Sequence, residues 1–73
     1  MEKREQLVKV DVKGLGEIIA PMGVLNTISI AFGDSARQSM IKYPDLPEAA
    51  RLYEDYSKQI YDVLKGLGLY DNQ

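Results

Sequence analysis

The side chains that could do chemistry here are hydroxyls and carboxylates, because the 73 residues include no His and no Cys. Without His, serines such as Ser29 and Ser57 lack the base that most often activates a serine nucleophile, and the commonest metal ligand is missing. Without Cys, a thiolate nucleophile, a thiolate zinc site and a disulfide are excluded. The carboxylates lack the spacing of a calcium loop. We therefore predict no enzymatic activity, no metal and no cofactor.

Two Gly-Leu-Gly sequences, at residues 14–16 and 66–68, resemble fragments of phosphate-binding loops. Neither has the third glycine of a dinucleotide-binding motif or the Gly-Lys-Ser/Thr ending of a P-loop. We interpret both sequences as helix boundaries.

The side chains best suited to binding are the tyrosines and the cations near them. A tyrosine combines apolar area with a polar tip, which suits interfaces and polar ligand pockets. Cations beside stacking tyrosines could line pockets between the chains of an oligomer, for a nucleotide or another anion. The candidate partner- or ligand-binding residues are Arg37, Gln38, Lys42, Tyr43, Arg51, Tyr61 and Tyr70.

Residues 32–39 allow a helix-turn-helix interpretation, with a glycine turn and with Arg37, Gln38 and Lys42 available for a DNA groove. However, Asp34 and Ser39 occupy positions where this motif needs apolar packing, and the net charge is −2. A nucleic-acid binder usually has a basic excess. The ordinary interpretation is a capped turn between two helices.

The clearest element is a C-terminal helix over residues 46–67. Asp45 can cap it, Pro47 suits its first turn, and Gly66 can end it. Apolar residues recur at alternating steps of four and three, which predicts a packing seam. The seam consists of Ala49, Tyr53, Tyr56, Ile60, Val63 and Leu67.

Charges on the same helix repeat with the same period, and each acid precedes a base by three residues. This spacing predicts ion pairs on the face opposite the seam. The pairs are Glu48–Arg51, Asp55–Lys58 and Asp62–Lys65.

The middle of the chain predicts a central apolar helix over residues 14–32, in which Leu25, Ile28 and Phe32 extend the packing seam. Pro21 would kink this helix or restart it. Several β-branched residues lower its helix propensity, so a strand over 27–32 is the alternative. Beyond Gly33 we expect a short bridging helix over 34–43, followed by Tyr43 and Pro44.

The N-terminal segment, residues 1–13, is the least determined part. Val8, Val10 and Val12 alternate with polar residues, which predicts a strand over 6–12. Such a strand needs a partner, either residues 27–32 or another copy of the chain. A helix over 2–10 is the other interpretation. Residues 68–73 are expected to form a tail.

A chain of 73 residues forms a single small domain, for which we predict an all-α fold. Domains below roughly 70–80 residues usually need a staple or a partner chain. A helical hairpin cannot cover both of its apolar stripes alone. We therefore expect a homo-oligomer, with a dimeric four-helix bundle as the simplest form.

Membrane insertion is disfavoured. The uncharged run over residues 18–32 is shorter than the about 20 apolar residues of a spanning helix, and it contains polar residues. The mixed charges of residues 1–6 do not match a secretory signal. With the cysteine-free composition, these features lead us to expect a cytoplasmic protein.

The predicted function is a non-enzymatic protein–protein interaction module, a small accessory regulator, adaptor or inhibitor that binds a larger macromolecule. The alternative is a nucleotide- or anion-binding protein with pockets between subunits. A DNA-binding regulator with a degenerate helix-turn-helix is the lesser alternative, because nucleic acid is disfavoured as a partner.

Overall fold

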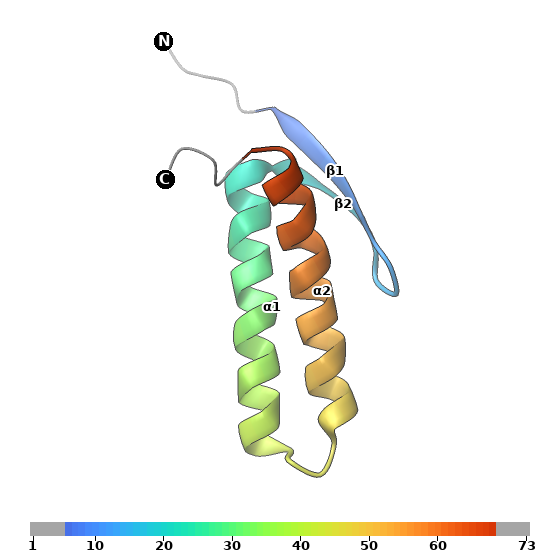
Figure 1. The fold of residues 1–73 in the computed structure, drawn as a ribbon, viewed down its shortest axis with the longest axis vertical. Helices are drawn as coiled ribbons and strands as arrows, with labels where there is room; N and C mark the ends of the chain where they lie inside the picture. The colour runs from blue at the N-terminus through green and yellow to red at the C-terminus, as the bar shows by residue number, and fades with distance from the viewer. Residues whose placement is uncertain (1–5, 69–73) are drawn as a thin grey trace.

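The computed structural model describes residues 6–68, which form a β-hairpin followed by two antiparallel helices (Figure 1). The strands are β1 (Leu7–Val12) and β2 (Gly16–Pro21). The helices are α1 (Met22–Lys42) and α2 (Pro47–Gly66). The fold is therefore mixed α+β, and the prediction of an all-α protein is wrong. The helix predicted over 46–67 is present as α2, and the strand predicted over 6–12 is present as β1.

The β-hairpin replaces residues 14–21 of the predicted central helix. β1 pairs with β2 in an antiparallel register that runs from Leu7 opposite Pro21 to Val12 opposite Gly16. Gly14 (φ 90°) and Gly16 (φ 138°) adopt positive φ values that glycine tolerates, which closes the tight turn. The partner of β1 is thus the adjacent segment, and neither residues 27–32 nor a second copy is needed to pair it.

α1 is a single helix of 21 residues that begins directly after Pro21 and continues through Gly33. The predicted break at Gly33, the separate helix over 34–43 and the alternative strand over 27–32 are all wrong. A Cβ added at Gly33 would lie 3.6 Å from the Ser57 hydroxyl oxygen of α2, so this glycine faces α2 at an ordinary contact distance. Tertiary packing here outweighs the weak helix propensity of the β-branched residues.

The core lies between the hairpin and the upper half of the helix pair in Figure 1. Alternation along β1 turns Val10 and Val12 inward, and they pack with buried side chains of both helices. The buried core residues are Val10, Val12, Leu25, Tyr56, Ile60 and Leu64. Ile28 and Phe32 of the predicted seam are partly buried against this cluster.

The buried stripe of α2 differs from the predicted seam. Ala50 and Leu64 are buried, whereas Ala49 is half-buried and Tyr53, Val63 and Leu67 are exposed. α2 packs against α1 on one side and against β1 on the other. Two neighbours in different directions therefore bury a stripe that a single-seam pattern does not describe.

Among residues 6–68, the ion pairs are Lys9–Glu17 (3.3 Å) and Asp34–Arg37 (2.6 Å). The three pairs predicted along α2 do not form. Exposed ion pairs between long side chains contribute little free energy, so spacing alone does not determine whether they form.

Candidate functional site

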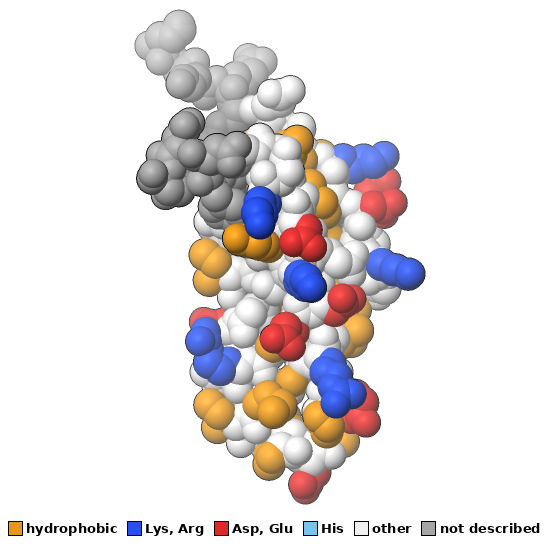
Figure 2. Space-filling view, in the orientation of Figure 1, with side chains coloured by type: hydrophobic (Ala, Val, Ile, Leu, Met, Phe, Trp, Pro, Cys, Tyr) orange, Lys and Arg blue, Asp and Glu red, His pale blue; other side chains and the backbone are white. Residues whose placement is uncertain are grey.

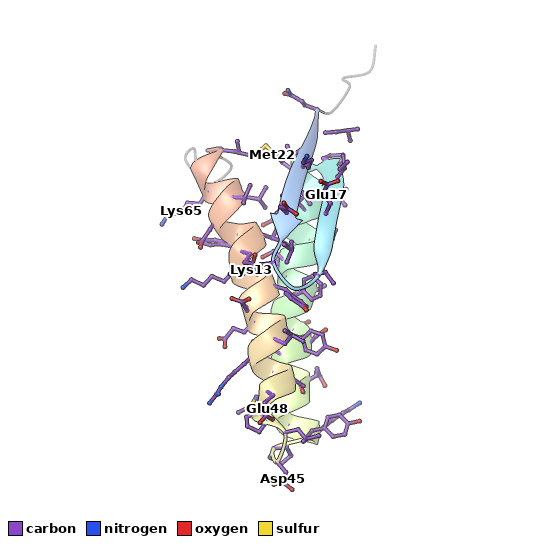
Figure 3. All side chains as sticks on the ribbon, turned by 90° about the vertical axis from the view of Figure 1, so that its right-hand side faces the viewer. Lys13, Glu17, Met22, Asp45, Glu48 and Lys65 are labelled. Carbon is purple, nitrogen blue, oxygen red and sulfur yellow. The ribbon has the colours of Figure 1, made fainter. Side chains whose placement is uncertain are left out.

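The β-hairpin covers only half of one face of the helix pair (Figure 3). Its turn is fixed near the middle of α2, where the Tyr56 hydroxyl donates a hydrogen bond to the Gly14 carbonyl oxygen at 3.0 Å. The side-chain amide of Gln59 binds the same turn through two hydrogen bonds to the Lys13 backbone. Its Oε1 accepts from the Lys13 backbone N–H at 2.7 Å, and its Nε2 donates to the Lys13 carbonyl oxygen at 3.2 Å. The sheet therefore ends level with Tyr56.

Beyond the turn, the rest of this face is an open hollow of about 490 Å³, which we name the tyrosine shelf. It is lined by Asp34, Ser35, Gln38, Ser39, Lys42, Tyr43, Leu46, Ala49 and Tyr53. Phe32 connects the shelf to the core, because its ring stacks on Tyr53 (6.3 Å) and meets Tyr56 edge-on (5.3 Å). Tyr43 and Leu46 are 55% and 56% exposed, so the shelf presents large apolar side chains to solvent.

The opposite face of the helix pair holds a second hollow of about 1020 Å³, which we name the groove. Its lining is Ser29, Ile30, Gly33, Ala36, Arg37, Met40, Pro47, Ala50, Arg51, Glu54, Ser57, Lys58 and Tyr61. Small residues of both helices form its floor. Ile30 (62% exposed), Met40 and Tyr61 form apolar parts of its rim. On the face shown in Figure 2, acidic and basic side chains alternate along the helix pair, and hydrophobic side chains gather at its lower end.

The charges in the groove are mixed in sign. Arg37 is paired with Asp34, but the side chains of Arg51, Glu54 and Lys58 form no ion pair or hydrogen bond within residues 6–68. Glu54 lies between the two free cations along α2. The groove is therefore not a uniformly positive site for an anion.

The floor of the groove is closed by a reciprocal pair of hydrogen bonds between the helices. The Ser29 hydroxyl donates to the Ser57 carbonyl oxygen (3.0 Å), and the Ser57 hydroxyl donates to the Ser29 carbonyl oxygen (2.7 Å). Both hydroxyls therefore form hydrogen bonds that join the two helices.

Within residues 6–68, the acidic side chains form no cluster of three or more that could hold a metal ion. In the same range, neither helix is long and apolar enough to cross a bilayer.

The predicted binding residues divide between the two surfaces. Arg37, Arg51 and Tyr61 line the groove, whereas Gln38, Lys42 and Tyr43 line the tyrosine shelf. Tyr70 lies outside the described residues. The candidates therefore do not converge on one ligand pocket within a single chain.

The proposed helix-turn-helix is absent, because residues 32–39 lie inside the continuous helix α1. This removes the structural basis of the DNA-binding alternative.

Sequence reasoning missed several residues of the two surfaces. Ile30, Met40 and Leu46 were not singled out, although all three are exposed. Lys58 was assigned to an ion pair on the face opposite the seam, but it lines the groove together with Glu54. A second period of alternating four- and three-residue steps runs through positions 47, 51, 54, 58 and 61. This period was the signal that could have placed Glu54 and Lys58 on one surface.

No protein-family model matches the chain, and neither a curated protein nor a solved structure matches it significantly. Function is therefore inferred from these two surfaces.

Proposed function

We propose that this protein is a non-enzymatic protein–protein interaction module, a small regulator, adaptor or inhibitor that binds a larger protein through the tyrosine shelf. The observation that supports this proposal is that the hairpin ends halfway along the helix pair. The turn contacts α2 at Tyr56, and the same face beyond it is left uncovered, with Tyr43 and Leu46 more than half exposed.

The composition of the shelf is that of a protein-binding patch. Tyr43, Leu46 and Tyr53 provide apolar contact area, and Gln38 and Lys42 provide polar groups around it. Aromatic anchors inside a polar rim are typical of protein interfaces. The partner that fits is a protein segment with an apolar anchor for the hollow and a carboxylate for Lys42.

We place this activity in the cytoplasm. The composition is compatible with that location, because a chain without cysteine needs no disulfide and therefore no oxidising compartment.

A photo-crosslinking residue at position 46 tests the proposal in the cells that express the protein. Leu46 lies in the shelf, whereas Glu17 lies on the outer side of the sheet and serves as the control position. We expect covalent capture of a different protein from position 46 and no such product from position 17. Capture of only further copies of this chain, or of nothing, from position 46 would contradict the proposal.

Two charge-changing variants separate binding from folding. Leu46→Asp places a carboxylate on the apolar shelf and should abolish capture of the partner. Glu48→Lys changes the charge of a nearby exposed residue outside the shelf lining and should leave capture unchanged. Far-UV circular dichroism should show the same helix content for both variants and for the parent chain.

Small-ligand binding is the second candidate function, and the unpaired cations Arg51 and Lys58 in the groove favour it. If the groove binds a nucleotide, millimolar nucleotide should raise the melting temperature of the protein, and Arg51→Ala should remove the shift. An unchanged melting temperature across a nucleotide panel would contradict this second function.

A further inference from the structure

We infer that the groove is the docking surface for a second copy of this chain, with the two α2 helices antiparallel around a two-fold axis level with residue 56. This dimer is independent of the tyrosine shelf, which lies on the other face of the helix pair. Self-pairing of one surface around a two-fold axis is the commonest form of oligomer.

The first support is the spacing of the α2 residues that face the groove. Apart from Ala50 and Ser57, the small residues of the floor, they follow one another at steps of four, three, four and three, and one further step of four reaches Lys65. This ridge consists of Pro47, Arg51, Glu54, Lys58, Tyr61 and Lys65. The spacing is symmetrical about residue 56. When two such ridges run antiparallel with residue 56 on the axis, each ridge residue therefore meets a ridge residue of the other copy.

The second support is the chemistry of the pairs that this symmetry creates. Glu54 meets the partner's Lys58, and Arg51 meets the ring of the partner's Tyr61. The first pair joins opposite charges, and the second is a cation–π contact. Each pair occurs twice, because the axis repeats it. Arg51, Glu54 and Lys58, which have no partner within the described chain, all gain one in the dimer.

The third support comes from α1. The hydrogen bonds between Ser29 and Ser57 place these residues at the same height on antiparallel helices. Ile30 is therefore level with residue 56, and the axis brings Ile30 against the partner's Ile30. Ile30 is 62% exposed in the single chain. The dimer thus buries an apolar contact between the α1 helices on the axis. The charged pairs between the α2 helices lie on the two sides of the same axis.

The other two-fold arrangement, with its axis parallel to the helices, is less favourable. It would place α1 over the partner's α2 at equal height. By the Ser29–Ser57 register, Arg37 is level with residue 49, so that arrangement brings Arg37 near the partner's Arg51. Like charges placed opposite each other oppose association.

Complementary single variants test the inter-chain pair directly. In Glu54→Lys, both Glu54–Lys58 contacts of the homodimer become contacts between two cations. In Lys58→Glu, both become contacts between two carboxylates. A mixture of the two variants allows a heterodimer in which both contacts again join opposite charges. Intrachain effects of either substitution remain in the mixture, so only an inter-chain contact explains recovery.

Sedimentation equilibrium over a range of chain concentrations is the measurement. We expect twice the 8.2 kDa chain mass for the parent protein. Each single variant should have a dissociation constant about tenfold or more above that of the parent. Their mixture should form dimer at the chain concentrations at which the parent protein does. Glu48→Lys, a charge change outside the groove lining, is the matched control and should dimerise with the dissociation constant of the parent. A monomeric parent at tens of micromolar, or a mixture no tighter than its components, would overturn the inference.

Discussion

Ser29 and Ser57 connect the two helices through hydrogen bonds in both directions, each hydroxyl donating to the backbone carbonyl of the other residue. The two hydroxyl oxygens are 3.3 Å apart. Ser29 is only 5% exposed, so these bonds form where water competes little. This contact sets the relative height of α1 and α2, and with it the composition of both uncovered faces.

Replacing these serines should reveal coupling between them. Ser29→Ala and Ser57→Ala should each lower the free energy of unfolding by about 1 kcal/mol, the usual net value of a hydrogen bond. The double variant should depart from additivity by about 0.5 kcal/mol or more, because the two side chains share one contact. Urea unfolding at a fixed chain concentration gives these values. Ser35→Ala, for which no such contact exists in the described chain, is the control. Equal effects at positions 29, 35 and 57 would contradict this role.

The Tyr56 hydroxyl should be needed to hold the hairpin turn. Tyr56→Phe removes its hydrogen bond to the Gly14 carbonyl oxygen while keeping the ring contact with Phe32. We expect a loss of about 1 kcal/mol in unfolding free energy and faster amide exchange in residues 13–16. Tyr53→Phe removes a hydroxyl that has no hydrogen bond within the described chain and should change neither quantity. The prediction fails if the two variants behave alike.

Two glycine-to-alanine changes should have opposite signs. Gly33 lies inside α1, and an added Cβ would make only an ordinary 3.6 Å contact, so Gly33→Ala should stabilise the fold by about 0.5–1 kcal/mol. Gly14 has a φ of 90°, which other residues rarely adopt, so Gly14→Ala should destabilise it. Thermal unfolding of both variants checks the signs, and a stabilising Gly14→Ala would show that the turn differs from the one described.

The buried stripe of α2 should be visible in truncation data. Leu64 is fully buried and Leu67 is 53% exposed, although only Leu67 belonged to the predicted seam. Leu64→Ala should cost about 2–5 kcal/mol, as buried leucines do, whereas Leu67→Ala should cost less than about 1 kcal/mol. Chemical denaturation of the two variants distinguishes the observed stripe from the predicted one, which would give the reverse order.

The elements that the sequence predicts well are those encoded locally. α2 combines Pro47 in its first turn, a regular apolar period and a terminal glycine, and it was located to within a residue at each end. The strand β1 was visible in the alternation of Val8, Val10 and Val12. Its partner was missed because Leu15 and Ile18 also fit helical steps, and because the glycines at 14 and 16 were interpreted as a helix boundary.

The misplaced break at Gly33 has a different cause. A glycine between two helical patterns usually marks a boundary, but this one lies where α1 approaches Ser57 of α2, which is distant in sequence. The same limit applies to the binding residues. Arg37 and Tyr43 were both selected, yet only the packing of α1 against α2 shows that they lie on opposite faces of the helix pair.

The central structural claim is that the groove, one of the two uncovered helix faces, is the docking surface for a second copy of this chain, and a single cysteine tests it most directly. The chain has no cysteine, so Ile30→Cys introduces its only thiol, at the position where the two-fold axis passes. Ile41→Cys places a thiol at a more exposed site on α1, outside the groove lining, as the control. Under mild oxidation at low micromolar concentration, we expect rapid disulfide-linked dimer from Ile30→Cys and little from Ile41→Cys. Equal or slower linkage at position 30 would contradict the account.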